Sequence, residues 1–407
     1  MRKSALARSL LTAGIVLASA GQVPLARAAQ PQFTALSVAP LYPPRAVLAT
    51  DGRTHLAYEL TVVNVTSLVV AIDALEAVDA ATGAVLASWS KEALRAIFRL
   101  NGHDPADTLG PGQSAMVFLD VALPPGVPVP QAIAHRLTTL RMVKTPGADM
   151  HTGTPVDPAL GIPARITFEG ARVDVDRQPA VRLEPPLRGP GWVVVNGCCA
   201  TITSHRGAAM AFDGTVKVPE RFAIDFIQID ANRRMFNGPA DKVESYPQFG
   251  VTIHAAAPGT VVGVVNDMPE EVPGAVRKGI TTDNAAGNHV VVDMGSGNFA
   301  LYAHLKTGSA TVKPGDRVAT GQVLGLLGST GNSDAPHLHF HVMDGPSPLA
   351  SQGLPYTFSS LTLRGRAVLD DATVDKGGPV TVDPGSAPGP RTNVLPLDQE
   401  VVDFPSN

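Results

Sequence analysis

The sequence predicts an all-β protein with two folded domains. Its 407 residues, 44% of them hydrophobic, are enough for more than one core. The apolar runs are short and alternate with polar residues, as in half-buried strands, and turn clusters rich in the 39 glycines and 36 prolines separate them. We therefore expect an N-terminal immunoglobulin-like β-sandwich followed by a second, β-rich domain.

The first segment has the pattern of a secretory signal peptide. Residues 1–28 combine a basic start, an apolar run from Leu10 to Ala20 and a small-x-small sequence that ends at Ala28. The apolar run is shorter than the roughly 20 residues of a membrane-spanning helix, and no other segment of the chain qualifies. We expect an exported protein without a membrane span, either periplasmic or extracellular.

Residues 35–176 are expected to form the sandwich. Runs such as HLAYELTVVNVT and SAMVFLDVAL alternate in hydrophobicity, and turn clusters separate them at 79–83, 109–113 and 123–128. The stretch 91–98 could add one or two helical turns. Four histidines of this region are expected to be exposed and without a role: His55, His103, His135 and His151.

The rest of the chain divides into three parts. Residues 177–191 contain four prolines and no periodicity, so we expect a linker. A second β-rich domain is expected over 192–358. Residues 366–407 are rich in Gly, Pro, Asp and Ser and are expected to be poorly ordered.

Charge and cysteine content exclude some classes of function. The formal net charge is -4, which offers no basic surface for nucleic acid. The only cysteines are the adjacent Cys198 and Cys199, so a framework of long-range disulfides is excluded. They are either two small buried residues or a vicinal disulfide, and no base and orienting partner for a thiolate nucleophile lies near them. The oligomeric state is left open.

The run PHLHFHV (336–342) carries the clearest functional pattern. Side chains of a strand alternate between its two faces, so His337, His339 and His341 share one face and the apolar residues share the other. Neighbours on one face lie roughly 7 Å apart, which lets one imidazole bind a metal while the next reaches a water molecule beside it. The strand is therefore a candidate metal site.

Three further runs offer polar side chains for the same site. They are TITSHR with His205, RFAIDF with Asp225, and FALYAHL with His304 on the face of Tyr302. A catalytic zinc site needs three protein ligands and one open position, and this set is large enough to supply them.

The segment 250–342 resembles the zinc endopeptidases of the lysostaphin and LytM type, which cleave peptide cross-links in bacterial peptidoglycan. The matching stretches are GVTIHAAAPGTVVGVV, GNHVVVDMGSGNFALYAHL and VKPGDRVATGQVLGLLGSTGNSDAPHLHF, together with the isolated Asp of AIDF. The resemblance implies a LytM-type antiparallel β domain, one Zn²⁺ per chain and peptidoglycan as the substrate.

The resemblance also implies roles for individual residues. By position in the motifs, Asp225 and His339 would be zinc ligands, while His304 and His337 would act on the attacking water and stabilise the oxyanion. Family members usually carry the remaining histidine ligand four residues before the aspartate, where this chain has Arg221.

The missing ligand leaves three alternatives. His205 is the best substitute, because it lies on the candidate strand before RFAID; His254 is a weaker one. With no third histidine at all, the enzyme would be inactive.

Two other departures concern the surroundings of the site. Many relatives carry Glu at the position of His341, which we expect beside the site rather than on the metal. The long insertion at 266–287 could wall the substrate groove or cover the site.

Two other functions compete with the zinc peptidase. The duplicated half-barrel of lipoyl and biotinyl carriers would explain the glycine-rich turns but not the histidines, and the exposed lysine that carriers modify is missing. A catalytically silent relative that binds peptidoglycan or activates another wall hydrolase is the stronger rival. Because four of five expected site positions are present, the sequence favours an active zinc metalloendopeptidase. Whether it cuts glycyl bridges or D-alanyl cross-links stays open.

Overall fold

The computed structural model describes residues 32–100, 107–200, 202–369, 372, 374–385 and 387–406. The predicted signal peptide (1–28) and His103 lie outside this part of the chain. From Thr34 onward the chain forms one compact unit. Within the described ranges, no helix combines the length and the apolar character needed to cross a membrane.

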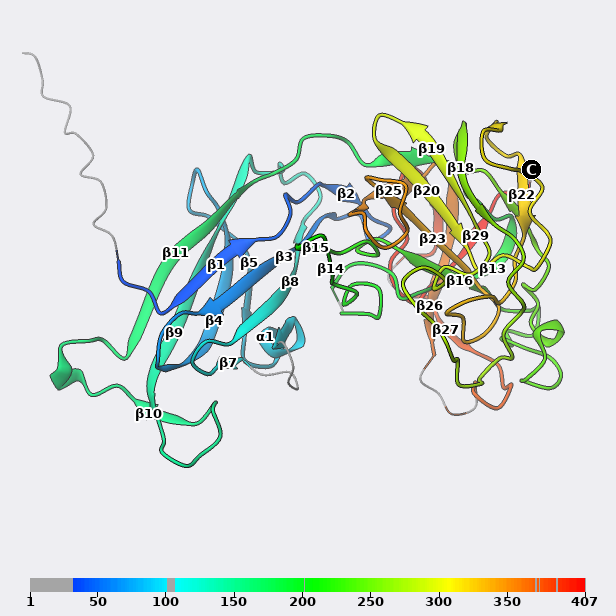
Figure 1. The fold of residues 1–407 in the computed structure, drawn as a ribbon. Coiled ribbons are helices and arrows are strands. Elements are labelled where there is room, and N and C mark those ends of the chain that lie inside the picture. Colours follow the sequence, from blue (N-terminus) through cyan, green and yellow to red (C-terminus); the bar gives the residue numbers. More distant parts are fainter. Residues whose placement is uncertain are drawn as a thin grey trace, which may run out of the picture. The chain divides into compact units, whose positions relative to one another are not determined.

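The N-terminal strands form two antiparallel sheets that enclose one core (Figure 1). The first sheet contains β1 (Leu36–Pro40), β2 (Val47–Leu48), β3 (Thr54–Asn64), β6 (Phe98–Leu100) and β8 (Ser114–Leu123). The second contains β4 (Val69–Asp79), β5 (Val85–Ser90), β7 (Thr108–Leu109), β9 (Ala132–Lys144), β10 (Gly153–Pro155) and β11 (Arg165–Asp174). Side chains of both sheets, such as Tyr58 and Leu75, meet in the core. The predicted sandwich is confirmed.

Helical structure is short in the described residues. The helix α1 (Lys91–Ala96) follows β5, where the sequence predicted one or two helical turns, and 3-10 turns cover Pro158–Leu160 and Val243–Ser245. The predicted all-β class is therefore confirmed.

A 12-stranded sheet dominates the remainder of the described chain. Its strands are β13 (Gly189–Val195), β16 (Ile224–Gln228), β18 (Gly259–Val265), β19 (His289–Gly295), β20 (Asn298–Ala303), β21 (Arg317–Val318), β23 (Leu338–Met343), β24 (Gly353–Leu354), β26 (Leu361–Val368), β27 (Thr381–Asp383), β28 (Gly389–Arg391) and β29 (Glu400–Phe404). Three two-stranded sheets accompany it: β12 (Val181–Leu183) with β25 (Tyr356–Phe358), β14 (Met210–Phe212) with β15 (Thr215–Lys217), and β17 (Thr252–His254) with β22 (Val323–Leu326).

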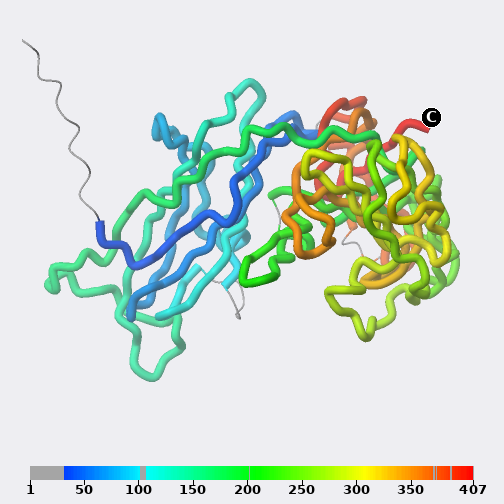
Figure 2. Tube along the Cα trace, turned by 45° about the horizontal axis from the view of Figure 1, so that its top comes forward, coloured from blue at the N-terminus to red at the C-terminus, as the bar shows by residue number. Residues whose placement is uncertain are grey.

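The C-terminal segment departs from the prediction of a poorly ordered tail over 366–407. Strand β29, in red in Figure 2, lies between β13 and β26 and pairs with both. Its residues Val401, Val402 and Phe404 are buried. The local composition is poor in apolar residues, but the open edge of β13 supplies hydrogen-bonding partners that composition does not reveal. The expectation is wrong for this segment.

Two histidines of the sandwich correct another expectation. His55 and His135 are buried rather than exposed, because each binds partners through both ring nitrogens. His55 contacts Asp120 through Nδ1 at 3.0 Å and Asp51 through Nε2 at 3.3 Å.

His135 contacts the Tyr58 hydroxyl at 2.7 Å and the Ala171 carbonyl at 2.8 Å. His151 is half-buried and pairs with Asp149 at 2.7 Å. Polar residues on one face of a strand can face either solvent or buried polar partners, and the sequence pattern does not tell these two cases apart.

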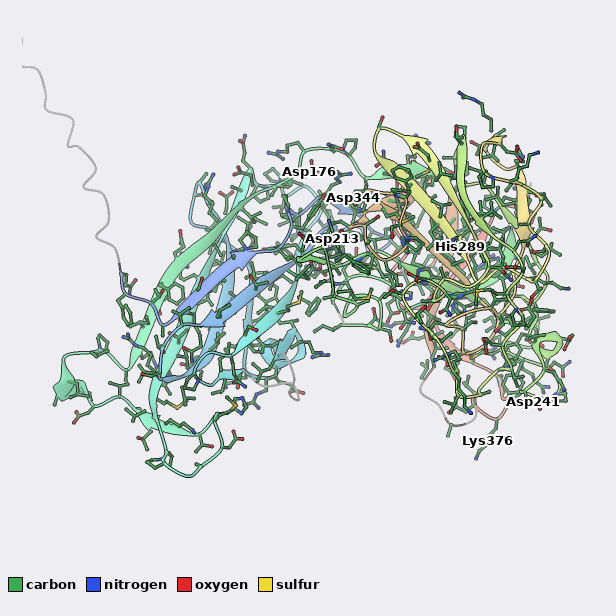
Figure 3. The ribbon with its side chains drawn as sticks, viewed as in Figure 1. Asp176, Asp213, Asp241, His289, Asp344 and Lys376 are labelled. Atoms are coloured by element: carbon green, nitrogen blue, oxygen red, sulfur yellow. A yellow bond between two sulfur atoms is a disulfide. The ribbon has the colours of Figure 1, made fainter. Side chains whose placement is uncertain are left out.

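An ion pair connects the end of the sandwich to the segment before β2. Asp176, labelled in Figure 3, follows β11 and pairs with Arg45 at 2.6 Å.

Cys198 and Cys199 form a vicinal disulfide, one of the two alternatives that the sequence left open.

Candidate metal centre

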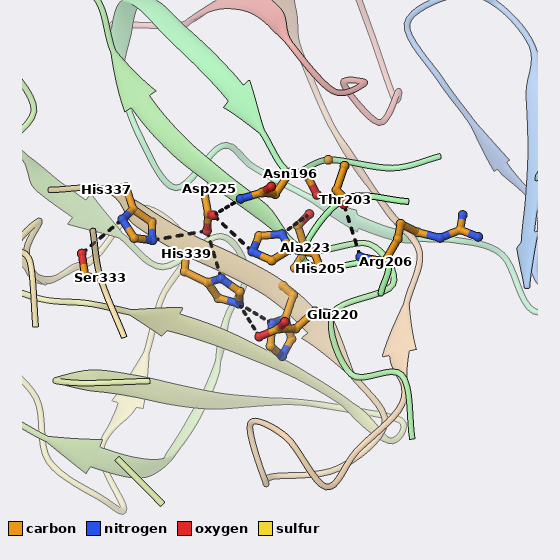
Figure 4. Close-up of polar contacts among 12 residues, drawn as sticks. Asn196, Thr203, His205, Arg206, Glu220, Ala223, Asp225, Ser333, His337 and His339 are labelled. Carbon is orange, nitrogen blue, oxygen red and sulfur yellow. Dashed lines mark hydrogen bonds and ion pairs between the residues drawn. The ribbon is translucent and has the colours of Figure 1, made fainter. Parts of the chain in front are cut away.

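Two neighbouring strands place the first pair of candidate ligands. In β16 and β23, Asp225 lies directly opposite His339 in the antiparallel register. Alternation sends Leu338 and Phe340 into the core, so His339 faces the other side, as the sequence predicts. His339 Nδ1 lies 3.0 Å from Asp225 Oδ1 (Figure 4).

His205 comes to the same carboxylate from a turn. The predicted strand over 201–206 is wrong, because residues 204–207 form a turn before the β14–β15 hairpin. His205 Nε2 nevertheless lies 3.2 Å from Asp225 Oδ2 (Figure 4). One donor atom each of His205, Asp225 and His339 lies within 4.8 Å of the other two.

Two more imidazoles flank this group. His337 directly precedes β23, and its Nε2 lies 3.4 Å from Asp225 Oδ1. The ring centroids of His304 and His337 are 4.5 Å apart. All five residues singled out in the sequence therefore meet at one place.

His304 reaches the site by an unexpected route. It follows the end of β20 with a left-handed backbone (φ 61°), which breaks the alternation of the strand. Tyr302 consequently packs in the core while His304 lines a cavity, so the prediction that they share a face is wrong.

Three of the site histidines bind a backbone carbonyl through Nδ1, and Nε2 of His205 and of His337 faces Asp225. The Nδ1 atom of His205 bonds to the Ala223 carbonyl at 3.2 Å, that of His304 to the Thr330 carbonyl at 2.7 Å and that of His337 to the Ala335 carbonyl at 2.8 Å. A backbone carbonyl only accepts, so each Nδ1 carries a proton and donates it. Metal-binding histidines are typically anchored in this way.

His339 is anchored by another imidazole. Its Nε2 lies 2.9 Å from His341 Nδ1, which leaves its own Nδ1 for Asp225 or a metal. His341 is fully buried. The expected place of His341, beside the site, agrees with this contact. Glu220 Oε1 lies 3.8 Å from His339 Nε2.

The donor set fits a zinc ion. Two imidazole nitrogens and a carboxylate are borderline and hard ligands of the kind that catalytic zinc uses with three protein ligands. Ligands must shed their protons before they bind a metal. His254, the weaker alternative, is bound instead to the Gly321 carbonyl and Arg188 Nε.

The charges of the site follow from burial and from the carboxylate. Burial opposes the charged form of His205, but Asp225 outweighs it and raises the pKa of His205 to about 9. Burial alone would raise the pKa of Asp225, whereas His205 and His337 hold it well below its ordinary value. Burial, His337 and His339 together lower the pKa of His304, which is therefore neutral.

A cavity of about 850 Å³ opens onto these residues. Besides the five site residues, it is lined by Glu220, His341 and part of the 266–287 insertion, including Arg277, Ile280 and Thr281. The insertion therefore walls the cavity, one of the two alternatives drawn from the sequence. Arg277 forms an ion pair with Asp334 from the segment just before His337.

In a second group of possible metal ligands, the donor atoms already have other partners. His55, Asp120 and Cys199 also lie within 4.8 Å of one another. Cys199 is bonded to Cys198, and both nitrogens of His55 contact carboxylates. This group is a structural ion pair beside a disulfide.

Sequence reasoning missed two residues around the centre. Asn196 donates to Asp225 Oδ2 at 2.8 Å, and Glu220 Oε1 lies 3.8 Å from His339 Nε2. It also missed that Arg221 binds Glu59. The sequence signal for Asn196 is that it is the first polar residue after the apolar run that ends in Val195. In the structure Val195 lies opposite Asp225. No signal marks Glu220 or the partner of Arg221.

Comparisons with known proteins concern the second half of the chain. Residues 245–351 match the sequence profile of the family described as Peptidase family M23. This match contains His304, His337 and His339, whereas His205 and Asp225 precede it. Two curated relatives share short segments with the chain.

The first, the peptidoglycan DD-endopeptidase ShyA of Vibrio cholerae, is 41% identical over 58 residues, 14% of this chain and 13% of its own length. The second, the glycyl-glycine endopeptidase ALE-1 of Staphylococcus capitis, is 38% identical over 86 residues, 21% of this chain and 22% of its own. The chain thus spans less than a quarter of either relative.

A solved structure was also found, the catalytic domain of a mutant of the prophage-encoded M23 protein EnpA from Enterococcus faecalis. It is 21% identical, covers 42% of this chain and 93% of its own, and superposes with a TM-score of 0.25. Residues 245–351 thus match the M23 peptidase family model, and the resemblance to the lysostaphin and LytM type is confirmed.

Proposed function

We propose that this chain is an exported zinc metalloendopeptidase that hydrolyses peptide cross-links of bacterial peptidoglycan. The observation that carries the proposal is the convergence of His205, Asp225 and His339 donors within 4.8 Å on the wall of a cavity. His304 and His337 beside them have no role in a purely structural metal site, which is closed by four protein ligands.

In this proposal His205, Asp225 and His339 would hold one Zn²⁺. When bound, the ion would supply Lewis-acid chemistry, which polarises a carbonyl and lowers the pKa of water. Asn196, His341 and the Ala223 carbonyl keep the three ligands in place through the bonds described above.

His304 and His337 act on the proton and the charge of the reaction. Each donates through Nδ1 to a backbone carbonyl. The neutral ring of His304 would take a proton from the attacking water. Nε2 of His337 lies 3.4 Å from Asp225 Oδ1, which favours a proton on that nitrogen. Once protonated, the same N–H donates to the oxyanion that develops on the scissile carbonyl. The neutral state of His304 suits it to the first task, and the Asp225 carboxylate, which raises the pKa of His337 despite burial, suits His337 to the second.

The substrate follows from the matched family and the names of the relatives. Those names specify a DD-endopeptidase acting on peptidoglycan and a glycyl-glycine endopeptidase. We infer peptide cross-links of the wall as the substrate class, and the cavity of about 850 Å³ is large enough for several peptide units.

Digestion of purified peptidoglycan tests the function. We expect the zinc-loaded chain to release fragments from walls with glycyl bridges or from walls with direct D-alanyl cross-links, and the fragment masses identify the bond. Asp225→Ala is the matched inactive control. Sacculi that are bound but not cut would contradict the proposal and support a silent wall-binding protein.

Export is tested separately. We expect the mature protein outside the cytoplasm, with an N-terminus near Ala29 that mass spectrometry of the intact protein would identify. A cytoplasmic protein that keeps residues 1–28 would contradict it.

A further inference from the structure

One of the three candidate ligands lacks the support of a sheet. Asp225 and His339 face each other on paired strands, whereas His205 lies in a turn. The disulfide and its neighbours lead into this turn from one side, and the β14–β15 hairpin follows on the other. The position of His205 therefore depends on the side-chain contacts of this turn.

Arg206, the next residue, anchors the turn. It is 1% exposed, and its guanidinium donates through Nη1 to the Cys199 carbonyl at 2.9 Å and through Nη2 to the Leu119 carbonyl at 3.2 Å. Leu119 belongs to β8 of the sandwich. The turn with His205 is thus fastened to the sandwich by the residue adjacent to the ligand.

Arg221 anchors the other end of the same segment. It is also buried, and it donates through Nε and Nη2 to the Glu59 carboxylate, with the shortest distance 2.6 Å. Its Nη1 donates to the Gly353 carbonyl at 3.1 Å. Arg221 stands four residues before Asp225, where the resemblance to the lysostaphin and LytM type implies a zinc-binding histidine, so this chain uses the position for a different purpose.

Glu59 is the point where the two arginines meet. It lies on β3 and is fully buried, 2.6 Å from Arg221 Nη2 and 4.0 Å from Arg206 Nη2. On β3 it shares a face with Ala57, which packs in the core of the metal-binding region, while Tyr58 on the other face packs inside the sandwich. Val218, which precedes Glu220, packs against Met116 and Phe118 of β8.

We propose that the sandwich is part of the metal centre, with Glu59 as a positioning residue that fixes His205 through Arg206 and Arg221. The inference rests on the proposed function, because it takes His205 as a zinc ligand. A fully desolvated carboxylate facing two buried guanidinium groups is costly to break from one side, since the remaining charge stays buried without a partner. The segment 205–221 is therefore held in one arrangement, and His205 with it.

A double-mutant cycle on zinc affinity tests the proposal in the full chain. The variants are Glu59→Gln, which keeps the shape of the side chain and removes its charge, His205→Ala, and both together. The dissociation constant of Zn²⁺ is measured by competition with a chelator. We expect Glu59→Gln to weaken zinc binding by roughly tenfold or more in the parent, as for other residues that orient a ligand. In the His205→Ala background, we expect no further loss.

The matched control is Glu76→Gln. Glu76 lies in the same sandwich and pairs with Arg136 at 2.8 Å, but both side chains are about one-third exposed, and their strands belong to a different sheet from β16. Its zinc affinity should equal that of the parent. Should Glu59→Gln fail to fold, Arg206→Lys replaces it in the cycle, because lysine cannot hold both carbonyls with a planar fork.

The outcomes separate this inference from the proposed function. Equal losses in both backgrounds, or no loss in either, would overturn the positioning role of Glu59. A parent chain that binds no zinc would instead overturn the proposed function. An unchanged affinity in His205→Ala would overturn the role of His205 and the inference together.

Discussion

The sandwich and the metal centre use buried histidines in opposite ways. In the sandwich, His55 and His135 each bind partners through both ring nitrogens. In the metal centre, His205 and His337 each use Nδ1 on a backbone carbonyl and bring Nε2 to the same carboxylate, that of Asp225. Burial alone therefore does not identify a functional histidine; the convergence of several imidazoles on one carboxylate does.

The charge partners differ as well. Two carboxylates raise the pKa of His55 to about 9 against the effect of burial, whereas burial lowers the pKa of His135 to about 4 because its contacts are a hydroxyl and a carbonyl. In the metal centre a single carboxylate, Asp225, serves three imidazoles. A carboxylate shared in this way can exchange its contacts with protonated imidazoles for a contact with a metal cation.

The largest expected effect is loss of the metal. His339→Ala removes a ligand from the middle of the set, so zinc content should fall from about one ion per chain to near zero, and peptidase activity with it. Atomic emission on the purified protein checks this. His135→Ala is the matched control, because it removes a buried imidazole from the sandwich, and this variant should keep its zinc. Equal zinc content in His339→Ala and His135→Ala would contradict the different roles of the two histidines.

The next largest effect concerns turnover with the metal retained. His304→Ala and His337→Ala should each keep zinc but lower kcat by roughly 10²- to 10⁴-fold, because each removes a proton-transfer group or a donor to the oxyanion. Zinc analysis and kinetics on a cross-linked peptide check this pair. Undiminished kcat in either variant would show that its free nitrogen has no part in the reaction.

The sandwich histidines should control stability with opposite dependence on pH. The folded pKa of His55, about 9, lies above its unfolded value, so its stabilisation is complete below pH 6.5 and is lost as pH rises through 9. The folded pKa of His135, about 4, lies below its unfolded value, so its stabilisation is complete above pH 6.5 and is lost as pH falls toward 4.

Each effect amounts to roughly 3 kcal/mol at most. Urea titrations of the zinc-free protein from pH 4 to 10 measure it, with His55→Gln expected to flatten the alkaline limb and His135→Gln the acid limb. If both variants changed the same limb, the assignment of partners would be wrong.

The smallest expected effect comes from His341. Because it binds the far nitrogen of His339, His341→Ala should weaken zinc affinity by roughly 10- to 100-fold and leave the ligand set intact. Chelator competition measures the change. His289→Ala, at a half-buried ring bound to its own loop at Gly287, is the control and should match the parent.

Sequence reasoning reached the fold class and the members of the site through local signals. Alternation in HLAYELTVVNVT and PHLHFHV fixes which side chains share a face, and the motif match brought His304, His337, His339 and Asp225 together. His205 is predicted from its place on the candidate strand before RFAID, and the structure brings it to Asp225 although residues 204–207 form a turn.

What the sequence missed depends on contacts between distant segments. Glu59 and Arg221 are separated by 162 residues, and nothing in either local pattern distinguishes a buried ion pair from two solvated charges. The left-handed backbone at His304 and the pairing of β29 likewise arise from surrounding structure. The local sequence pattern predicts which side chains share a face of a strand. Packing between distant segments determines what each face contacts.

The position of β29 has a consequence for the order of assembly. Strand β13, whose last residue lies opposite Asp225, keeps an open edge until residues 400–404 dock on it. In a chain that emerges N-terminus first, the scaffold behind the candidate ligands is completed only after residues 400–404 have followed the last of those ligands, His339. The arrangement of Asp225 and His339 would therefore be secured only once a segment well beyond both of them had paired with β13.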